Sequence, residues 1–221
     1  MLNSLRTFKL RLSKIWLIAM LMVITQSAFA DWLDDYASYV QKEASKYNVP
    51  GYAFVFYEQG KAPRVYVYGS TRKRGGEKVT ENTVFRLASV SKTFTALLSA
   101  KLVEKNQLSW ETPITTLLPD IPFKGKGMNA LQLQHIGALE YYFSNNNTSY
   151  SRQLQANLFA PLGMKTASVG KGGLFASESW AQPHIAIARN KWREGKVESN
   201  YYRFSPAAGV NASISDMTIY M

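Results

Sequence analysis

Residues 85 to 95 of this 221-residue chain read Phe85-Arg86-Leu87-Ala88-Ser89-Val90-Ser91-Lys92-Thr93-Phe94-Thr95. From residue 89 to about residue 105, apolar residues recur at helical spacing, which predicts a buried helix. Because positions i and i+3 share a helix face, Lys92 is expected within reach of the Ser89 hydroxyl. A neutral amine there could accept the serine proton, and a helix N-terminus favours oxyanion charge. Ser89 and Lys92 are therefore a candidate nucleophile and base.

The Ser-x-x-Lys spacing is a weak signal by itself, because it occurs three times. The three pairs are Ser70 with Lys73, Ser89 with Lys92, and Ser168 with Lys171. The first lies in a basic loop and the third among glycines, so neither serine is expected on a rigid element. Only the second pair begins a long segment of helical periodicity. The spacing alone is also explained by a purely structural alternative, in which Ser89 caps the helix and Lys92 is a solvated residue of its first turn.

The context of the pair, residues 79–95, resembles the active-site segment of class C β-lactamases. Segments 107–114, 158–164 and 207–217 are similar to later family segments in the same order. The resemblance covers most of residues 34–221 and extends to penicillin-binding serine hydrolases. It implies an α+β fold, with a β-lactamase/transpeptidase-like antiparallel sheet, flanking helices and a helical region. It also implies that Ser89 is the acylated nucleophile and Lys92 its proton-handling partner.

Two motifs expected from this resemblance are missing from the sequence. None of the thirteen tyrosines is followed by Asn two residues later, so the Tyr-x-Asn proton relay has no counterpart. An internal deletion near residue 134 is the simplest explanation. The chain also contains no Lys-Thr-Gly or Lys-Ser-Gly, the family motif that supplies the second oxyanion-hole N–H. We therefore expect a domain that is incomplete at its C-terminus and impaired or inactive in turnover.

The first thirty residues predict a secretory signal peptide. Basic residues precede an apolar run at residues 15–25, and Ala28-Phe29-Ala30 offers a cleavage site. The chain has no cysteine, which excludes a lipid-modified cysteine and disulfides. We expect a signal peptide at residues 1–30 and a partial β-lactamase-like serine hydrolase domain at residues 31–221. The expected location is the periplasm, without a stable membrane anchor after cleavage.

The composition is globular, with 46% hydrophobic and 19% charged residues. The formal net charge is +11, but the basic residues are dispersed, so nucleic acid is not an expected partner. With only two histidines and no cysteine, neither a metal site nor a cofactor is expected. The resemblance implies a monomer that takes a small-molecule β-lactam or a peptidoglycan-like substrate.

Local patterns predict a helix from residue 32 to about residue 47 and a hairpin of strands at residues 52–58 and 64–68. The helix after Ser89 is expected to pack on this hairpin, and further helices are expected near residues 130–143 and 150–159. Ser213 begins a capping-box-like pattern, but the residues after it are too few for an ordinary helix.

Two other functional readings remain open at this level. A non-catalytic truncated remnant explains the missing motifs, and a cell-wall-binding module would use the positive charge and the aromatic residues as its contact surface.

Overall fold

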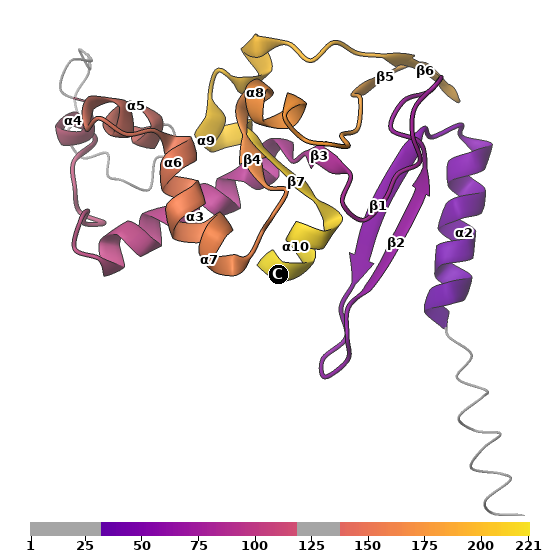
Figure 1. Ribbon diagram of the computed structural model, residues 1–221, viewed down its shortest axis with the longest axis horizontal. Coiled ribbons are helices and arrows are strands. Elements are labelled where there is room, and N and C mark those ends of the chain that lie inside the picture. Colours follow the sequence, from indigo (N-terminus) through magenta and orange to yellow (C-terminus); the bar gives the residue numbers. More distant parts are fainter. Residues whose placement is uncertain (1–31, 119–137) are drawn as a thin grey trace, which may run out of the picture. The chain divides into compact units, whose positions relative to one another are not determined.

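The computed structural model describes residues 32–118 and 138–221 (Figure 1). The expected signal peptide lies outside these ranges, as do residues 130–137 of the helix expected near residue 130. The chain divides into two units, Met1–Ser45 and Lys46–Met221. In the first unit the described residues belong to helix α2 (Trp32–Lys46), as the sequence pattern predicts. No helix within the described ranges is both long and apolar enough to cross a membrane.

The second unit begins with the predicted hairpin. Strand β1 (Gly51–Phe56) pairs antiparallel with β2 (Arg64–Gly69), in a register that places Phe54 opposite Tyr66. The rings of these two residues stack with their centroids 4.9 Å apart. Gly60 takes a positive φ of 78° in the connecting loop, a conformation that glycine adopts without a steric cost. Alternating aromatic and β-branched residues thus form this hairpin as expected.

A second antiparallel sheet leads into the candidate site. It consists of β3 (Val84–Arg86), β7 (Val210–Ser213) and β4 (Ser168–Val169), with β7 in the middle and buried along its whole length. A separate hairpin is formed by β5 (His184–Ala188) and β6 (Lys191–Glu194). Directly after β3, the 3₁₀ turn Ala88–Val90 and helix α3 (Ser91–Glu104) follow.

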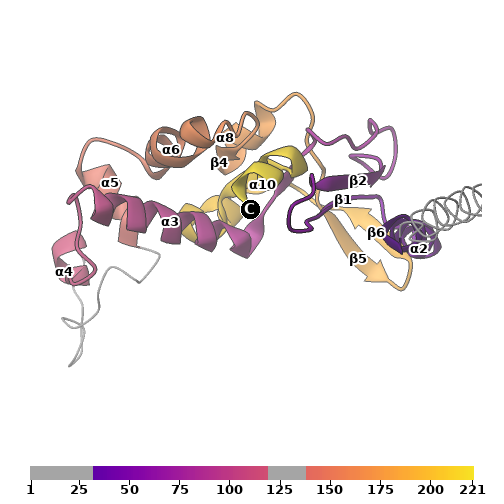
Figure 2. The same ribbon diagram turned by 90° about the horizontal axis from the view of Figure 1, so that it is seen from below.

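Helix α3 forms the centre of the larger core. Phe94, Leu98 and Leu102 are buried in it and pack with apolar residues of the later helices. These helices are α4 (Ile114–Leu117), α5 (Ala138–Asn145), α6 (Tyr150–Leu154), the π-helical turn Gln155–Phe159, and α7 (Ala160–Leu162). Figure 2 shows α3 and α6 side by side, with α10 (Ile214–Tyr220) near the start of α3. Mixed helices and antiparallel strands confirm the expected fold class.

Two sequence-based expectations for α3 are wrong in detail. Val90 and Leu97 fit the apolar periodicity, but their side chains are 44% and 37% exposed. The helix was also expected to pack on the β1–β2 hairpin. Instead it packs mainly against α9 (Ser205–Ala208), α6 and the π-helical turn, whereas α10 contacts β1. The periodicity identifies a buried face but not the elements that cover it.

The segment between β4 and β7 forms a smaller core over the second sheet. It contains α8 (Gly170–Phe175) and the 3₁₀ turn Ser199–Tyr202. Leu174 of α8, Val197 and Tyr202 are buried there against Val84 of β3. This arrangement holds the segment before β7 in place, and its continuation, α9, lies against the start of α3.

Candidate active site

The chain turns sharply between β3 and α3. Ala88 has a φ of 47°, in the left-handed region that residues with a Cβ atom rarely adopt. Strained backbone of this kind occurs often at functional sites, where the surrounding structure holds it. Here the amide of Leu87 donates a hydrogen bond to the Val210 carbonyl of β7 at 3.0 Å. The following residue, Ser89, is exposed and lies in the 3₁₀ turn, two residues before the α-helix begins.

The two side chains that the sequence singles out lie together. The Nζ atom of Lys92 is 2.8 Å from the Oγ atom of Ser89. The same Nζ atom donates a second hydrogen bond, to the carbonyl of Ala207 in α9, at 3.0 Å. The serine is therefore accessible from solvent, while the lysine beside it is partly buried and fixed from two directions. Sequence reasoning missed the carbonyl of Ala207, because a backbone acceptor 115 residues away leaves no sequence signal.

The other two Ser-x-x-Lys pairs have different surroundings. Ser70 donates a hydrogen bond to the carbonyl of Arg72, and Lys73 Nζ donates to the carbonyl of Trp192 at 2.8 Å. The Nζ atom of Lys171 lies 5.6 Å from the ring centroid of Phe175.

Ser168 corrects an expectation. It belongs to β4, where it pairs with Asn211 of β7, and its Oγ atom accepts a hydrogen bond from Asn211 Nδ2 at 3.3 Å. The prediction that Ser168 is not held on a rigid element is therefore wrong. A strand of two residues gains its order from pairing with β7, and this pairing has no local sequence pattern.

Next to the turn, aromatic side chains cover the end of β3. The guanidinium of Arg86 lies 4.1 Å from the ring centroid of Tyr201, and Tyr202 donates its hydroxyl proton to Asn211 Oδ1 at 2.8 Å. Burial raises the pKa of Tyr202 to about 12, with a smaller opposing effect from Arg86 and a small further increase from Tyr201. A phenol that stays protonated and donates to a buried amide is suited to a structural role rather than to proton relay.

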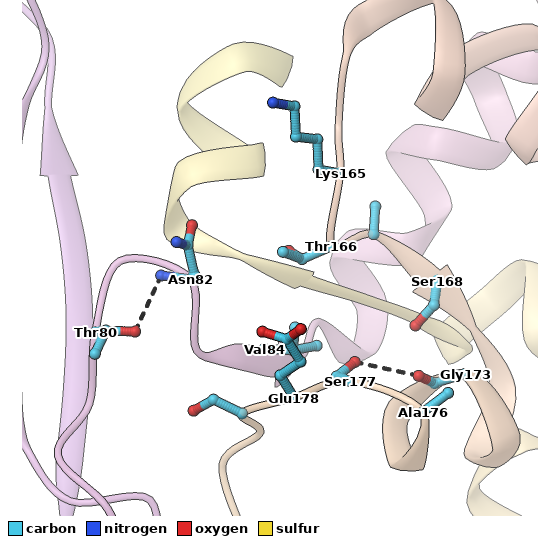
Figure 3. A pocket seen from close by; sticks show the side chains of 12 residues that line it. Thr80, Asn82, Val84, Lys165, Thr166, Ser168, Gly173, Ala176, Ser177 and Glu178 are labelled. Atoms are coloured by element: carbon cyan, nitrogen blue, oxygen red, sulfur yellow. Dashed lines mark hydrogen bonds between the residues drawn. The ribbon is translucent and has the colours of Figure 1, made fainter.

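A hollow of about 680 Å³ lies at the other end of β3 (Figure 3). Its lining includes Val84 of β3 and Ser168 of β4, together with polar residues from three loops, among them Thr80, Thr166 and Glu178. Neither Ser89 nor Lys92 lines it. The candidate nucleophile therefore lies outside this hollow. Within the described ranges, no group of three or more His, Cys, Asp or Glu side chains is arranged to hold a metal ion.

Comparisons of the sequence match this chain to β-lactamases. The family model described as Beta-lactamase matches residues 36–138. A β-lactamase of Yersinia enterocolitica is 30% identical over 141 residues, which are 60% of this chain and 36% of that protein. A β-lactamase of Pseudomonas fluorescens is 28% identical over 160 residues, 66% of this chain and 44% of that protein. The chain thus spans less than half the length of these two curated relatives.

Solved structures agree on the fold. A D-amino acid amidase from Ochrobactrum anthropi SV3, complexed with L-phenylalanine amide, has a TM-score of 0.68 at 18% identity, covering 85% of this chain and 68% of its own. A class C β-lactamase from Rhodobacter sphaeroides has a TM-score of 0.65 at 19% identity, and the match covers 83% of this chain and 63% of that protein. An octameric penicillin-binding protein homologue from Pyrococcus abyssi has a TM-score of 0.71 at 16% identity, and the match covers 85% of this chain and 55% of that protein.

Proposed function

We propose that this chain, in which the family model described as Beta-lactamase matches residues 36–138, is a serine acyl-transfer protein. In this proposal Ser89 is the nucleophile and Lys92 its proton acceptor. The observation that carries the proposal is the 2.8 Å separation of Lys92 Nζ from Ser89 Oγ on a strained, exposed turn. Hydrogen-bond distance between a nucleophile and its base is the geometry that general-base activation needs.

The proposed reaction has two proton transfers. As the Oγ atom of Ser89 forms a bond to the carbonyl carbon of the substrate, its proton passes to the Nζ atom of Lys92. The tetrahedral intermediate then collapses, the carbon–nitrogen bond of the substrate breaks, and Lys92 returns the proton to the leaving nitrogen. The product is an ester between Ser89 and the acyl group. The Ala207 carbonyl keeps one Lys92 N–H occupied, which leaves the Nζ atom directed at Ser89.

The proposed substrate class is a β-lactam or a related amide or peptide of cell-wall type. The curated relatives are β-lactamases, and the structures with the same fold include a D-amino acid amidase and a penicillin-binding protein homologue. All of these names fit attack on an amide carbonyl or recognition of penicillin. The proximity of Ser89 and Lys92 supports their proposed roles as the nucleophile and base that such an attack requires.

We propose further that turnover by this chain is slow. Its sequence contains neither Tyr-x-Asn nor Lys-Thr-Gly, and Tyr202 is engaged with Asn211. Loss of a single oxyanion donor reduces kcat by roughly a hundredfold or more. The acyl ester on Ser89 should therefore outlast the time in which an efficient hydrolase would release it. Export to the periplasm by a signal peptide at residues 1–30 is also proposed, on the basis of the basic and apolar pattern there.

The experiment is to incubate the folded chain with a fluorescent penicillin, digest it, and locate the label by peptide mass spectrometry. Release of hydrolysed penicillin is followed in parallel. The proposal predicts a label on Ser89 that forms faster than it is released. A label on another residue, or a folded chain that acquires none, would contradict it, and the second result would favour a non-catalytic relative.

A further inference from the structure

We propose that Thr95 and Ser91 are positioning residues that orient Lys92 through the backbone of residues 205–210. This inference rests on the proposed role of Lys92 as proton acceptor. It assigns a function to two buried hydroxyls of α3 that form hydrogen bonds with the backbone of residues 206 and 210. Their exposed fractions are 0% for Ser91 and 1% for Thr95.

The backbone of residues 205–210 is held by side chains from two helices. The four hydrogen-bonded pairs are Ser205 N with Glu140 Oε2 (3.1 Å), Pro206 O with Thr95 Oγ1 (2.6 Å), Ala207 O with Lys92 Nζ (3.0 Å), and Val210 N with Ser91 Oγ (3.0 Å). Three of the four side chains belong to the first two turns of α3, and the fourth belongs to α5. The segment that presents the acceptor for Lys92 is thus fixed on both sides of that acceptor.

Thr95 is the central member of a chain of hydrogen bonds. Its Oγ1 atom lies 2.7 Å from the hydroxyl of Tyr150, and burial keeps the pKa of Tyr150 well above its usual value. The protonated phenol therefore donates to Thr95, whose own proton is directed at the carbonyls of Pro206 and, at 3.1 Å, Ser91. Successive hydrogen bonds of this kind polarise and strengthen one another. The chain ends one peptide group before the Ala207 carbonyl.

Burial makes this arrangement sensitive to a single hydroxyl. A buried polar group left without a partner costs about 1–3 kcal/mol, so the backbone at Pro206 would shift to find another donor. The adjoining Ala207 carbonyl would shift with it and would no longer fix the Nζ atom of Lys92. A lysine side chain has many rotamers, and holding it in one of them requires contacts such as this. The predicted consequence is a slower chemical step with substrate binding preserved.

The test compares three variants of the full chain. Thr95→Val keeps the shape and removes the hydroxyl, Thr95→Ser restores the hydroxyl, and Ser99→Ala is the matched control. Ser99 is also buried on α3, but its Oγ atom donates within the helix, to the Thr95 carbonyl, at 2.9 Å. Acylation by the fluorescent penicillin is measured over a concentration series, which separates the acylation rate constant from the binding constant.

For Thr95→Val we expect an acylation rate constant reduced about tenfold, equivalent to about 1.4 kcal/mol, with the binding constant changed less than about twofold. Thr95→Ser should restore most of the rate, and Ser99→Ala should leave it unchanged. Equal losses in Thr95→Val and Ser99→Ala would overturn the proposal, because they would indicate a general effect of core polarity. A change confined to the binding constant would overturn it too.

A second readout does not depend on acylation. Limited reaction with acetic anhydride, quantified by peptide mass spectrometry, reports how readily the Nζ atom of Lys92 leaves its partners. We expect Thr95→Val, and Tyr150→Phe if Thr95→Val does not fold, to raise the labelling rate of Lys92 relative to that of Lys171. Ser99→Ala should not. If Ser89 is never acylated, the proposed function fails but this labelling still decides the inference, and unchanged labelling of Lys92 would refute it.

Discussion

Lys92 Nζ lies 2.8 Å from the Oγ atom of Ser89, which precedes it by three residues. The same Nζ atom is also held by a hydrogen bond to the carbonyl of Ala207. If Lys92 accepts the serine proton, its replacement by alanine should slow acylation of Ser89 by about a hundredfold to ten-thousandfold. The measurement is the time course of adduct formation with the fluorescent penicillin, by intact mass. Lys171→Ala, which removes the lysine of another Ser-x-x-Lys pair, is the control and should react at the wild-type rate. Equal rates for Lys92→Ala and the wild type would refute the role of Lys92.

The packing of α3 predicts opposite results for two of its apolar residues. Phe94 is fully buried, with its ring stacked on that of Tyr220 at 4.0 Å, whereas the side chain of Leu97 is 37% exposed. Phe94→Ala should lower the free energy of unfolding by about 3–5 kcal/mol, because it removes buried surface and leaves a cavity. Leu97→Ala should cost clearly less than the 2–5 kcal/mol typical of a core leucine. Urea unfolding measures both, and a similar loss in the two variants would contradict the packing described here.

His184 should make stability depend on pH. Its Nε2 atom accepts a hydrogen bond from the Lys73 amide at 3.2 Å, which requires an unprotonated nitrogen. Burial lowers the pKa of His184 below the usual 6.5 and Lys73 lowers it further, while Glu194 and the backbone of Gln182 act in the opposite direction. Because the folded state binds the proton less tightly than the unfolded state, this contribution is fully present above pH 6.5 and is lost as the pH falls through the folded pKa.

The check on His184 is urea unfolding of the wild type and His184→Gln at about pH 7 and about pH 5, on either side of the usual histidine pKa. Glutamine offers an acceptor but does not titrate in this range. The free energy of unfolding should therefore fall more on acidification in the wild type than in the variant. An equal fall in both proteins would show that His184 makes no such contribution.

Ser213 caps the N-terminus of α10, where its Oγ atom accepts a hydrogen bond from the Asp216 amide at 3.1 Å. Replacement of an N-cap serine by alanine costs about 1 kcal/mol, so Ser213→Ala should lower the free energy of unfolding by that amount. Ser144→Ala is a suitable control, since Ser144 donates to the Glu140 carbonyl of its own helix and is exposed. Urea unfolding of both variants tests the cap. A loss for Ser144→Ala as large as that for Ser213→Ala would argue against it.

Local patterns predicted the elements of this fold better than their contacts. The period of alternation in residues 51–69 is enough to define the β1–β2 hairpin, and helical spacing is enough to place α3. The partners of α3 depend on long-range packing, which is why the hairpin was wrongly expected to cover it. Burial of individual residues also depends on these partners, so Leu97 fits the periodicity and is still substantially exposed.

In the candidate site, too, a local sequence pattern predicts one contact but not the long-range contacts. Ser89 and Lys92 are three residues apart, so a local rule predicted their proximity. The backbone acceptor of Lys92 and the buried partner of Thr95 at Pro206 lie more than a hundred residues further along the chain. A backbone carbonyl is present at every residue, so no sequence pattern marks the one at Ala207. The order of Ser168 likewise comes from pairing with β7 and not from its glycine-rich neighbourhood.

The central claim is that Ser89 is a nucleophile that forms a covalent ester. The most direct measurement is the intact mass of the purified chain after incubation with a penicillin, for the wild type, Ser89→Ala and Ser168→Ala. The account predicts one added penicillin on the wild type and on Ser168→Ala, and none on Ser89→Ala. Absence of an adduct on a wild-type chain that unfolds cooperatively, or an equal adduct on Ser89→Ala, would contradict it.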